Sequence, residues 1–334
     1  MDNLDLLSVT AAELKIGMYV ILPLAWHEHP FLKNHFLIQS EGEISKIREL
    51  GVKGIQIDPS RSRRIETASA GEAKASRDSS AEPQPAQKVS PDELITTIRD
   101  VSLTPEKKSI VVRQHSITMM KSLLENPTAQ NMKEAQKGIS EVVNLILTDD
   151  DTLHYLLDIT SHDFYTYTHS VSVGVLAIAL AKSLFKDSTN HDMRALGMGF
   201  FLHDVGKVGI DPSLITKPGK LTSTEMQEMR RHPALGFKLL HETRQLTEES
   251  KTIVLQHHER FDGGGYPKGL RGSEIHIYGR ICSIADVYDA LTSDRPYRKK
   301  LPPYEALKIM YNEMIQHFQR DLFQQFVLMF KAPA

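Results

Sequence analysis

A long polar segment between Ser60 and Ser90 divides the chain and constrains what it can fold into. The segment contains one isoleucine, one valine and no aromatic residue, and it is dominated by alanine, serine, glutamate and proline. Such a composition cannot bury enough apolar surface to offset the entropy lost on ordering the chain. We therefore expect a small domain over residues 1–60, a disordered linker over residues 61–90 and a large domain over residues 91–334.

Composition and charge exclude several classes of protein. The 40 basic and 42 acidic residues give a net charge of −2, which excludes a globally basic nucleic-acid-binding protein. The single cysteine, Cys282, excludes a disulfide framework and any zinc site built from several cysteines. The longest apolar run, Val171–Ala181, is shorter than the roughly 20 residues of a membrane span. The start of the chain lacks the basic region of a signal peptide. We expect a cytoplasmic protein without a membrane span.

The small domain has the pattern of a mixed α/β module. Short apolar runs at 18–22, 36–38 and 54–58 are typical of strands. Residues 43–50 have apolar side chains at helical spacing, and Gly51 suits the end of that helix. We expect three strands and one helix here.

The large domain is predicted to be almost wholly helical, so the fold class is mainly α. Residues 170–184 are apolar nearly all round, which indicates a buried helix. Thr222 and Glu225 form a capping-box pattern, and Thr247 is suited to begin another helix. Further helical stretches are expected at 92–125, 129–147, 192–203, 281–291, 303–316 and 322–330.

The pair His203-Asp204 is the first candidate for chemistry. It ends an apolar helix and is followed by Gly206 and Lys207. A histidine and an aspartate at the mouth of a buried helix are costly unless they are paired or bound to metal. The structural alternative is a capping aspartate beside a packed histidine.

A second cluster, His257-His258-Glu259, precedes a glycine-rich loop. The loop continues to Tyr266-Pro267, and its three consecutive glycines offer backbone freedom and exposed N–H groups. Adjacent histidines at a helix end can serve one ion or two neighbouring ions. The alternative is a pair of surface histidines followed by an ordinary turn.

Three further residues complete the candidate set. His169 opens the buried helix, His232 precedes a proline, and Asp286 lies on an otherwise apolar helix. Each alone is more often structural than functional. Together the candidates supply five histidines and two aspartates on separate helices, with no cysteine. Imidazole and carboxylate ligands suit iron, manganese, zinc or nickel.

These motifs resemble the two signatures of the HD-GYP family, phosphodiesterases of the HD superfamily that act on cyclic di-GMP. The signatures are His203-Asp204-Val-Gly-Lys207 and His257-His258-Glu259-x-x-Asp262-Gly-x-Gly265-Tyr266-Pro267. The front of the chain is similar to the small domain of unknown function that often precedes HD-GYP. The resemblance implies an all-helical HD-type bundle after a small α/β domain.

The resemblance also implies a two-metal centre with Asp204 as the bridge. One ion would be bound by His169, His203, Asp204 and Asp286, and the other by Asp204, His232, His257 and His258. Relatives with a third ion have a glutamate where this chain has Tyr165. We therefore expect two divalent ions, iron or manganese first, with nickel, zinc and magnesium as further candidates.

Substrate contacts follow from the same resemblance. Lys207 matches the lysine beside the attacking water, and Tyr266 and Gly265 match the loop at the substrate pocket. Arg295 and Arg298 match the positions that hold substrate phosphates. The expected product is linear pGpG, with further hydrolysis to GMP open.

Two alternatives to a cyclic di-GMP phosphodiesterase stay open at this point. One is a cyclic di-GMP receptor or adaptor with little turnover. The family's glycine-Tyr-Pro loop is associated with docking to diguanylate cyclase (GGDEF) domains, and a homodimer is a further expectation. The other alternative is an HD-superfamily hydrolase of a different nucleotide.

Overall fold

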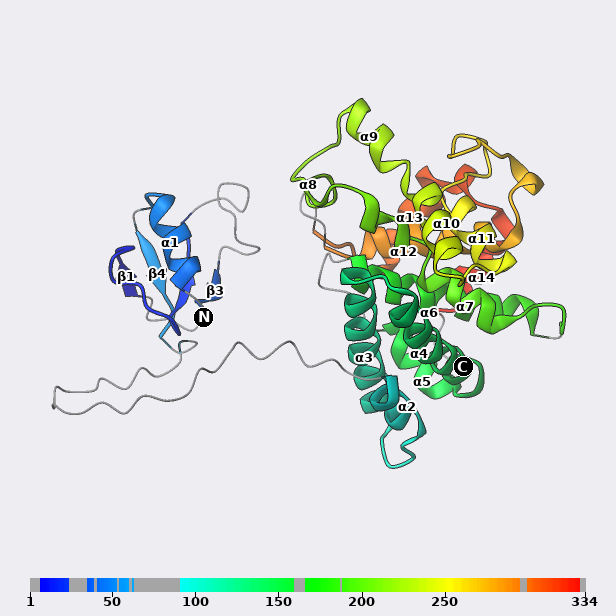
Figure 1. The fold of residues 1–334 in the computed structure, drawn as a ribbon, viewed down its shortest axis with the longest axis horizontal. Helices are drawn as coiled ribbons and strands as arrows, with labels where there is room; N and C mark the ends of the chain where they lie inside the picture. The colour runs from blue at the N-terminus through cyan, green and yellow to red at the C-terminus, as the bar shows by residue number, and fades with distance from the viewer. Residues whose placement is uncertain are drawn as a thin grey trace. The chain divides into compact units, whose positions relative to one another are not determined.

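Two compact units make up the chain, Met1–Glu82 and Pro83–Ala334 (Figure 1). The computed structural model describes residues 7–23, 35–38, 41–52, 54–59, 62, 91–158, 166–186, 188–294 and 299–330. Apart from Ser62, the predicted linker lies outside the described residues.

A four-stranded antiparallel sheet forms the N-terminal unit. Its strands lie in the order β1-β4-β2-β3, and the helix α1 packs its apolar side chains, including Ile44 and Ile47, into the same core as Val20 and Ile55. The element bounds are β1 Leu7–Val9, β2 Tyr19–Ile21, β3 His35–Leu37, α1 Glu41–Glu49 and β4 Ile55–Ile57. The sequence indicated all of these except β1, an edge strand whose residues are exposed or half-buried and therefore show no buried apolar pattern.

All the secondary-structure elements in the described residues of the C-terminal unit are helices, which confirms the expected fold class. Its helices are α2 Pro91–Arg99, α3 Pro105–Glu125, α4 Ala129–Thr148, α5 Asp150–Asp158, α6 Thr166–Phe185, α7 Met193–Phe201, α8 Pro212–Ile215, α9 Ser223–Met229, α10 His232–Glu242, α11 Glu248–Gln256, α12 Ile277–Thr292, α13 Pro303–Glu313 and α14 Arg320–Leu328. Short 3₁₀ turns lie at η1 Val205–Gly209, η2 Gly272–Glu274 and η3 Ile315–His317.

The periodic stretch over residues 92–125 is divided into two helices. α2 ends at Arg99, and α3 begins at Pro105 with Thr104 as its N-cap. The Thr104 hydroxyl oxygen accepts a hydrogen bond from the Lys107 N–H. Proline has no N–H for an intrahelical hydrogen bond, so it is tolerated in the first turn and starts a new helix here. The Thr222–Glu225 capping box at the start of α9 is present as predicted.

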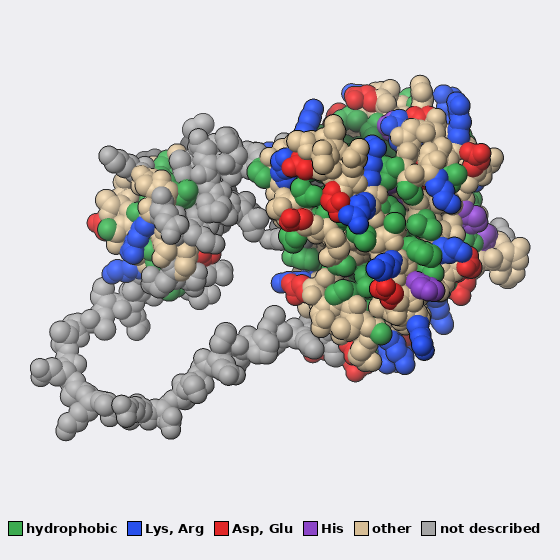
Figure 2. All heavy atoms as spheres, turned by 45° about the horizontal axis from the view of Figure 1, so that its top comes forward, with side chains coloured by type: hydrophobic (Ala, Val, Ile, Leu, Met, Phe, Trp, Pro, Cys, Tyr) green, Lys and Arg blue, Asp and Glu red, His purple; other side chains and the backbone are tan. Residues whose placement is uncertain are grey.

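Helix α6 lies at the centre of the C-terminal unit. It packs against α3, α7 and α12, and its residues from Ser170 to Ala181 are nearly all buried. By length and composition it is the one helix among the described residues that would suffice to cross a membrane, but most of it is buried inside the unit. On the outside, the face drawn in Figure 2 has basic and acidic side chains interspersed rather than gathered by sign.

The packing of α4 against α7 generates a stability prediction. A methyl group added at Gly197 on α7 would overlap Cγ2 of Val143 on α4, which is fully buried. We expect Gly197→Ala to destabilise the protein by about 1–3 kcal/mol because the core is overpacked. Val143→Ala removes the overlapping methyl group, so the double variant should lose less than the sum of the two single losses. Urea denaturation of the four proteins measures this, and additive losses would contradict the contact.

Candidate metal centre

The seven predicted ligands come from five helices that lie together in the C-terminal unit (Figure 1). His169 is in the first turn of α6, and Asp286 is on α12. The remaining ligands lie at helix ends: His203 and Asp204 follow α7, His232 begins α10, and His257 and His258 follow α11.

Two sets of ligand atoms share the Asp204 carboxylate. Within each set, one ligand atom from every residue lies within 4.8 Å of the others. The sets are His169, His203 and Asp204, and Asp204, His232, His257 and His258. The division is the one that the family resemblance implies, except that Asp286 is not in the first set.

The first set faces the Oδ2 atom of Asp204. The Nε2 atoms of His169 and His203 both lie 3.5 Å from this oxygen and 3.3 Å from each other. Asp286 is nonetheless close, because its Oδ1 lies 3.1 Å from His169 Nε2.

The second set faces the Oδ1 atom of Asp204. His232 Nε2 lies 3.2 Å and His257 Nε2 3.6 Å from this oxygen, and the two nitrogens are 3.2 Å apart. The Nδ1 atom of His258 lies 3.4 Å from Asp286 Oδ2. Asp204 thus lies between the two sets, and Asp286 contacts one histidine of each.

Backbone carbonyls fix which nitrogen of three imidazoles carries the proton. The Nδ1 atoms of His203, His232 and His257 donate to carbonyl oxygens three residues earlier, at 2.8, 2.8 and 2.9 Å. A carbonyl oxygen can only accept, so each Nδ1 is protonated and each Nε2 presents a lone pair. These lone pairs all point toward the Asp204 carboxylate.

This arrangement fits a bound cation. The Nε2 lone pairs of His232 and His257, which lie 3.2 Å apart, repel each other and the facing carboxylate unless positive charge lies between them. Asp204 is 1% exposed, and its Oδ1 has no hydrogen-bond partner among the described residues. A buried, unpartnered carboxylate oxygen is costly. The site is therefore suited to bind divalent metal.

Burial keeps most of these imidazoles neutral, which is the form that binds metal. Burial, reinforced by neighbouring histidines, lowers the pKa of His203 to about 4 and that of His232 to about 3. It also lowers the pKa of His258 well below its usual value. Burial alone would raise the pKa of Asp204, but Lys207 and the histidines outweigh it and hold that pKa well below the usual range.

His169 differs because carboxylates surround it. Burial acts to lower its pKa, but contacts with Asp204, Asp286 and Asp289 raise the pKa to about 10. Without a metal ion, a proton on this ring supplies the positive charge that the carboxylates require. Bound metal would replace that proton.

Asp289 is a functional candidate that the sequence reasoning missed. It is buried on α12, and its Oδ2 accepts a hydrogen bond of 2.7 Å from His169 Nδ1. Such a carboxylate orients a metal-binding histidine and increases its basicity. The available signal was its position three residues after Asp286, on the same helical face.

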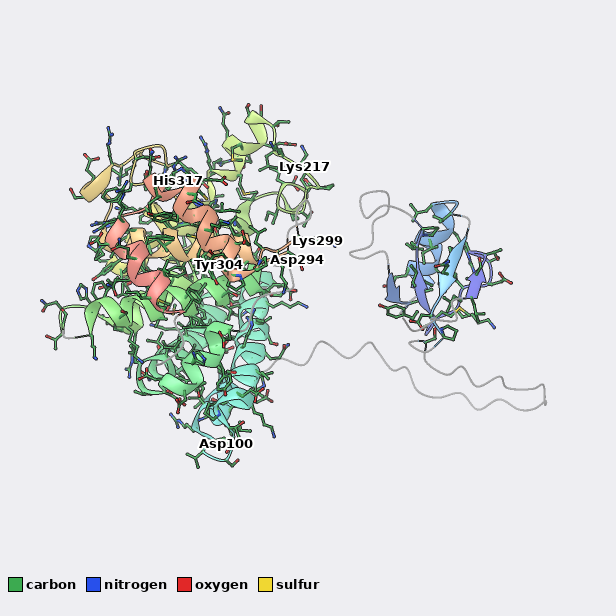
Figure 3. The ribbon with its side chains drawn as sticks, turned by 180° about the vertical axis from the view of Figure 1, so that it is seen from behind. Asp100, Lys217, Asp294, Lys299, Tyr304 and His317 are labelled. Atoms are coloured by element: carbon green, nitrogen blue, oxygen red, sulfur yellow. The ribbon has the colours of Figure 1, made fainter. Side chains whose placement is uncertain are left out.

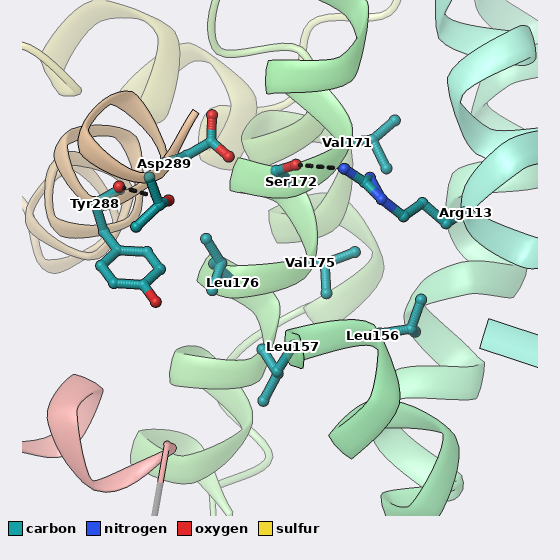
Figure 4. Close-up of a pocket in the computed structure, with 10 residues that line it drawn as sticks. Arg113, Leu156, Leu157, Val171, Ser172, Val175, Leu176, Tyr288 and Asp289 are labelled. Atoms are coloured by element: carbon teal, nitrogen blue, oxygen red, sulfur yellow. Dashed lines mark hydrogen bonds between the residues drawn. The ribbon is translucent and has the colours of Figure 1, made fainter. Parts of the chain in front are cut away.

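A small cavity lies beside Asp289, between α3, α5, α6 and α12 (Figure 4). Leu156, Val175, Leu176 and Tyr288 contribute apolar lining to it. Arg113 from α3 reaches its edge and donates a long hydrogen bond of 3.4 Å to Ser172 Oγ on α6. Asp289 therefore shares this cavity with residues of α3 and α5, two helices that carry no predicted ligand.

The predicted catalytic and loop residues adjoin the ligands. The Lys207 ammonium donates to Asp204 Oδ2. The Tyr266 ring centroid lies 4.7 Å from that of His258. Gly265 packs directly on the backbone of Glu259 and Arg260, where a side chain would overlap main-chain atoms.

Glu259 holds the glycine loop in place, a role that the sequence did not indicate. The side chain is buried, and its two carboxylate oxygens accept hydrogen bonds from the N–H groups of Lys268 at 2.7 Å and Leu270 at 3.0 Å. Glu259, which directly follows the histidine pair, thus anchors the loop that carries Tyr266.

Arg295, Arg298 and Tyr165 lie outside the described residues. The described chain stops at Asp294 and resumes at Lys299, both labelled in Figure 3. Asp294 Oδ1 accepts a hydrogen bond of 3.0 Å from the Lys300 N–H, which ties the two ends together. The roles of both arginines therefore stay predictions.

Comparison with known families identifies the class of protein. The HD domain family matches residues 152–322, and a domain of unknown function, DUF3391, matches residues 6–148. The chain therefore belongs to the HD domain family, and the resemblance stated from its motifs is confirmed. The DUF3391 match continues through α2–α4, beyond the first compact unit.

Individual relatives agree with this assignment. The chain is 34% identical over 324 residues to the cyclic di-GMP phosphodiesterase PA4108 of Pseudomonas aeruginosa, covering 96% of this chain and 75% of that protein. It is 32% identical over 208 residues to 3′3′-cGAMP-specific phosphodiesterase 3 of Vibrio cholerae, covering 58% of this chain and 44% of that protein.

A solved structure shares the fold. Bd1817, a HDG“Y”P protein from Bdellovibrio bacteriovorus, superimposes with a TM-score of 0.61 over 98% of this chain and 100% of that chain. The two sequences are 18% identical, so this likeness supports the fold alone.

The hydrogen bond between His169 and Asp289 leads to a prediction about metal affinity. Asp289→Asn keeps the size of the side chain but removes the charge that supports the imidazole. We expect metal affinity to fall about 10- to 100-fold, measured by competition with a chromogenic chelator. Asp158→Asn is the control, because that exposed carboxylate pairs with His154 outside the site. Equal affinities of the wild type and Asp289→Asn would contradict the role of Asp289.

Proposed function

We propose that the protein is a metal-dependent phosphodiesterase that hydrolyses cyclic di-GMP to linear pGpG, with onward hydrolysis to GMP, in bacterial signalling. The observation that carries the proposal is the buried Asp204 carboxylate, with imidazole lone pairs facing both of its oxygens. A relative covered over most of its length is named for the same substrate.

The residues of the site have different roles in the proposed hydrolysis. When bound, the metal ions supply Lewis acidity for an attacking water and for the leaving oxygen. Lys207 adds a positive charge beside Asp204, where negative charge develops on the phosphodiester. Burial raises the pKa of Tyr266, so its hydroxyl stays protonated and can donate a hydrogen bond to substrate. Arg295 and Arg298 are proposed to hold phosphate oxygens bidentately.

We propose a centre of two ions with iron or manganese as the preferred metals, as the family resemblance implies, and the imidazole–carboxylate donor set suits both. No thiolate is available near the ligands, because Cys282 is buried and its thiol pKa is raised by burial. Tyr165 in place of a carboxylate favours two ions over three. We also propose that the protein acts in the cytoplasm, forms a homodimer and docks GGDEF domains through the Gly263–Pro267 loop.

Product analysis tests the proposed activity. The anaerobically purified protein is loaded with iron or manganese and incubated separately with cyclic di-GMP, 3′3′-cGAMP and cyclic di-AMP, and the products are resolved by chromatography. We expect pGpG from cyclic di-GMP. Asp204→Asn should abolish turnover and lower the metal content, because it removes the carboxylate shared by both ligand sets.

His241→Asn is the matched control for this experiment, because His241 is an exposed histidine at the end of α10. It should keep both metal and turnover. Tight binding of cyclic di-GMP without any product, whichever metal is loaded, would instead favour the receptor function. Turnover by Asp204→Asn above a few per cent of the wild-type rate would contradict the metal centre.

Arg298→Ala separates a substrate contact from a structural role. The loss of a charge-assisted phosphate contact, worth roughly 1.5–3 kcal/mol, should raise the Michaelis constant about 10- to 150-fold with the metal retained. Steady-state kinetics at matched metal content measure the effect. An unchanged Michaelis constant with a lowered melting temperature would assign Arg298 a structural role.

A further inference from the structure

Arg230 lies at the edge of the metal centre, and neither the motifs nor the proposed chemistry assigns it a role. It follows the last residue of α9 and precedes His232 by two positions. Its guanidinium carbon lies 5.0 Å from the centroid of the Tyr266 ring. Tyr266 in turn contacts the His258 ring, at 4.7 Å between centroids. The phenol ring therefore contacts both the guanidinium and a histidine ligand.

The neighbouring arginine shows what is unusual about Arg230. Arg231 is exposed, and its Nη1 donates to both carboxylate oxygens of Glu228, at 2.7 and 2.8 Å. Arg230 is also exposed, but within the described ranges its guanidinium forms no hydrogen bond or ion pair. The contact with the aromatic face positions the guanidinium, and its N–H donors stay available to a ligand.

We infer that Arg230 recognises the O6–N7 edge of a guanine base of the substrate. A guanidinium presents paired donors in a plane, and guanine O6 and N7 are two adjacent acceptors that match them. If the phosphodiester lies at the ligand nitrogens, the base lies one sugar away from it. Arg230 contacts the Tyr266 ring, which itself contacts a histidine ligand, and a position one ring away from the ligands suits a contact with a base rather than with the scissile phosphate. The inference rests on the proposed function and adds a determinant of base specificity to it.

Recognition of this edge discriminates between bases. Adenine presents N7 as an acceptor but an amino group in place of O6, so a guanidinium donor there meets another donor. A guanine-binding Arg230 therefore favours cyclic di-GMP over cyclic di-AMP. Cyclic dinucleotides with one base of each kind, such as 3′3′-cGAMP, should rank between them if both base positions are read.

Three substitutions of Arg230 test the inference by steady-state kinetics on the metal-loaded full chain. Arg230→Ala should lower kcat/KM for cyclic di-GMP, and with it the preference over cyclic di-AMP, by about 5- to 150-fold. Arg230→Lys should recover only part of the preference because lysine lacks the planar fork. Arg230→Gln should shift the preference toward adenine, whose N6 and N7 pair with an amide. Arg231→Ala, the matched control, should leave the preference unchanged.

Equilibrium binding of the linear dinucleotides pGpG and pApA to the same proteins gives a readout that does not depend on turnover. Selective loss of pGpG affinity in Arg230→Ala supports the inference. An equal loss for pGpG and pApA would assign Arg230 to a phosphate and overturn it. Unchanged affinity for both would also overturn it, because the arginine would then only cover the Tyr266 ring. A wild type that binds pGpG selectively but hydrolyses no cyclic dinucleotide would defeat the proposed function and not this inference.

Discussion

The Asp204 carboxylate lies fully buried between two pairs of imidazoles, and the meeting of the surrounding helices depends on it. Each of its oxygens faces two Nε2 atoms at 3.2–3.6 Å. The nearby carboxylates of Asp286 and Asp289 add to the negative charge. Lys207 is the cation in direct contact with Asp204. Lys207 and a proton on His169 balance only part of the charge of three carboxylates, so a bound cation would further stabilise the contact between these helix ends.

Three of the histidines also satisfy the ends of the helices that precede them. The last carbonyl groups of an α-helix have no partner within the helix. His203, His232 and His257 each follow a helix closely and donate Nδ1–H to the carbonyl three residues earlier, in α7, α9 and α11. One ring therefore satisfies a helix end and fixes the direction of its own Nε2. This explains why ligand positions coincide with helix ends and why the site needs little support from loops.

The sequence predicted the helical class, the capped starts of α9 at Thr222 and α11 at Thr247, and the histidines and Asp204 that the fold brings together. It could do so because buried helices, capping boxes and the two signature motifs are local patterns. The role of Asp289 depends on His169, which lies 120 positions away in the chain. The role of Glu259 depends on the N–H groups of Lys268 and Leu270, which lie 9 and 11 positions away. No local spacing expresses such pairings. The strand β1 lies at the sheet edge without a buried apolar pattern, and its partner β4 is far away in the chain.

Helices α2–α4 have a consequence for how this protein family evolves. They fall within the DUF3391 match, yet they fold with the HD helices, where α3 packs on α6 and α4 packs on α7. A recombination event at the junction of the two family matches, near residue 150, would remove α2–α4 and expose the apolar surface that they cover on the HD helices. A junction upstream of Pro91, where α2 begins, leaves the packing of α2–α4 on the HD helices intact. The unit of inheritance is therefore longer than the HD domain itself, and α2–α4 should be inherited with the catalytic helices whatever precedes them.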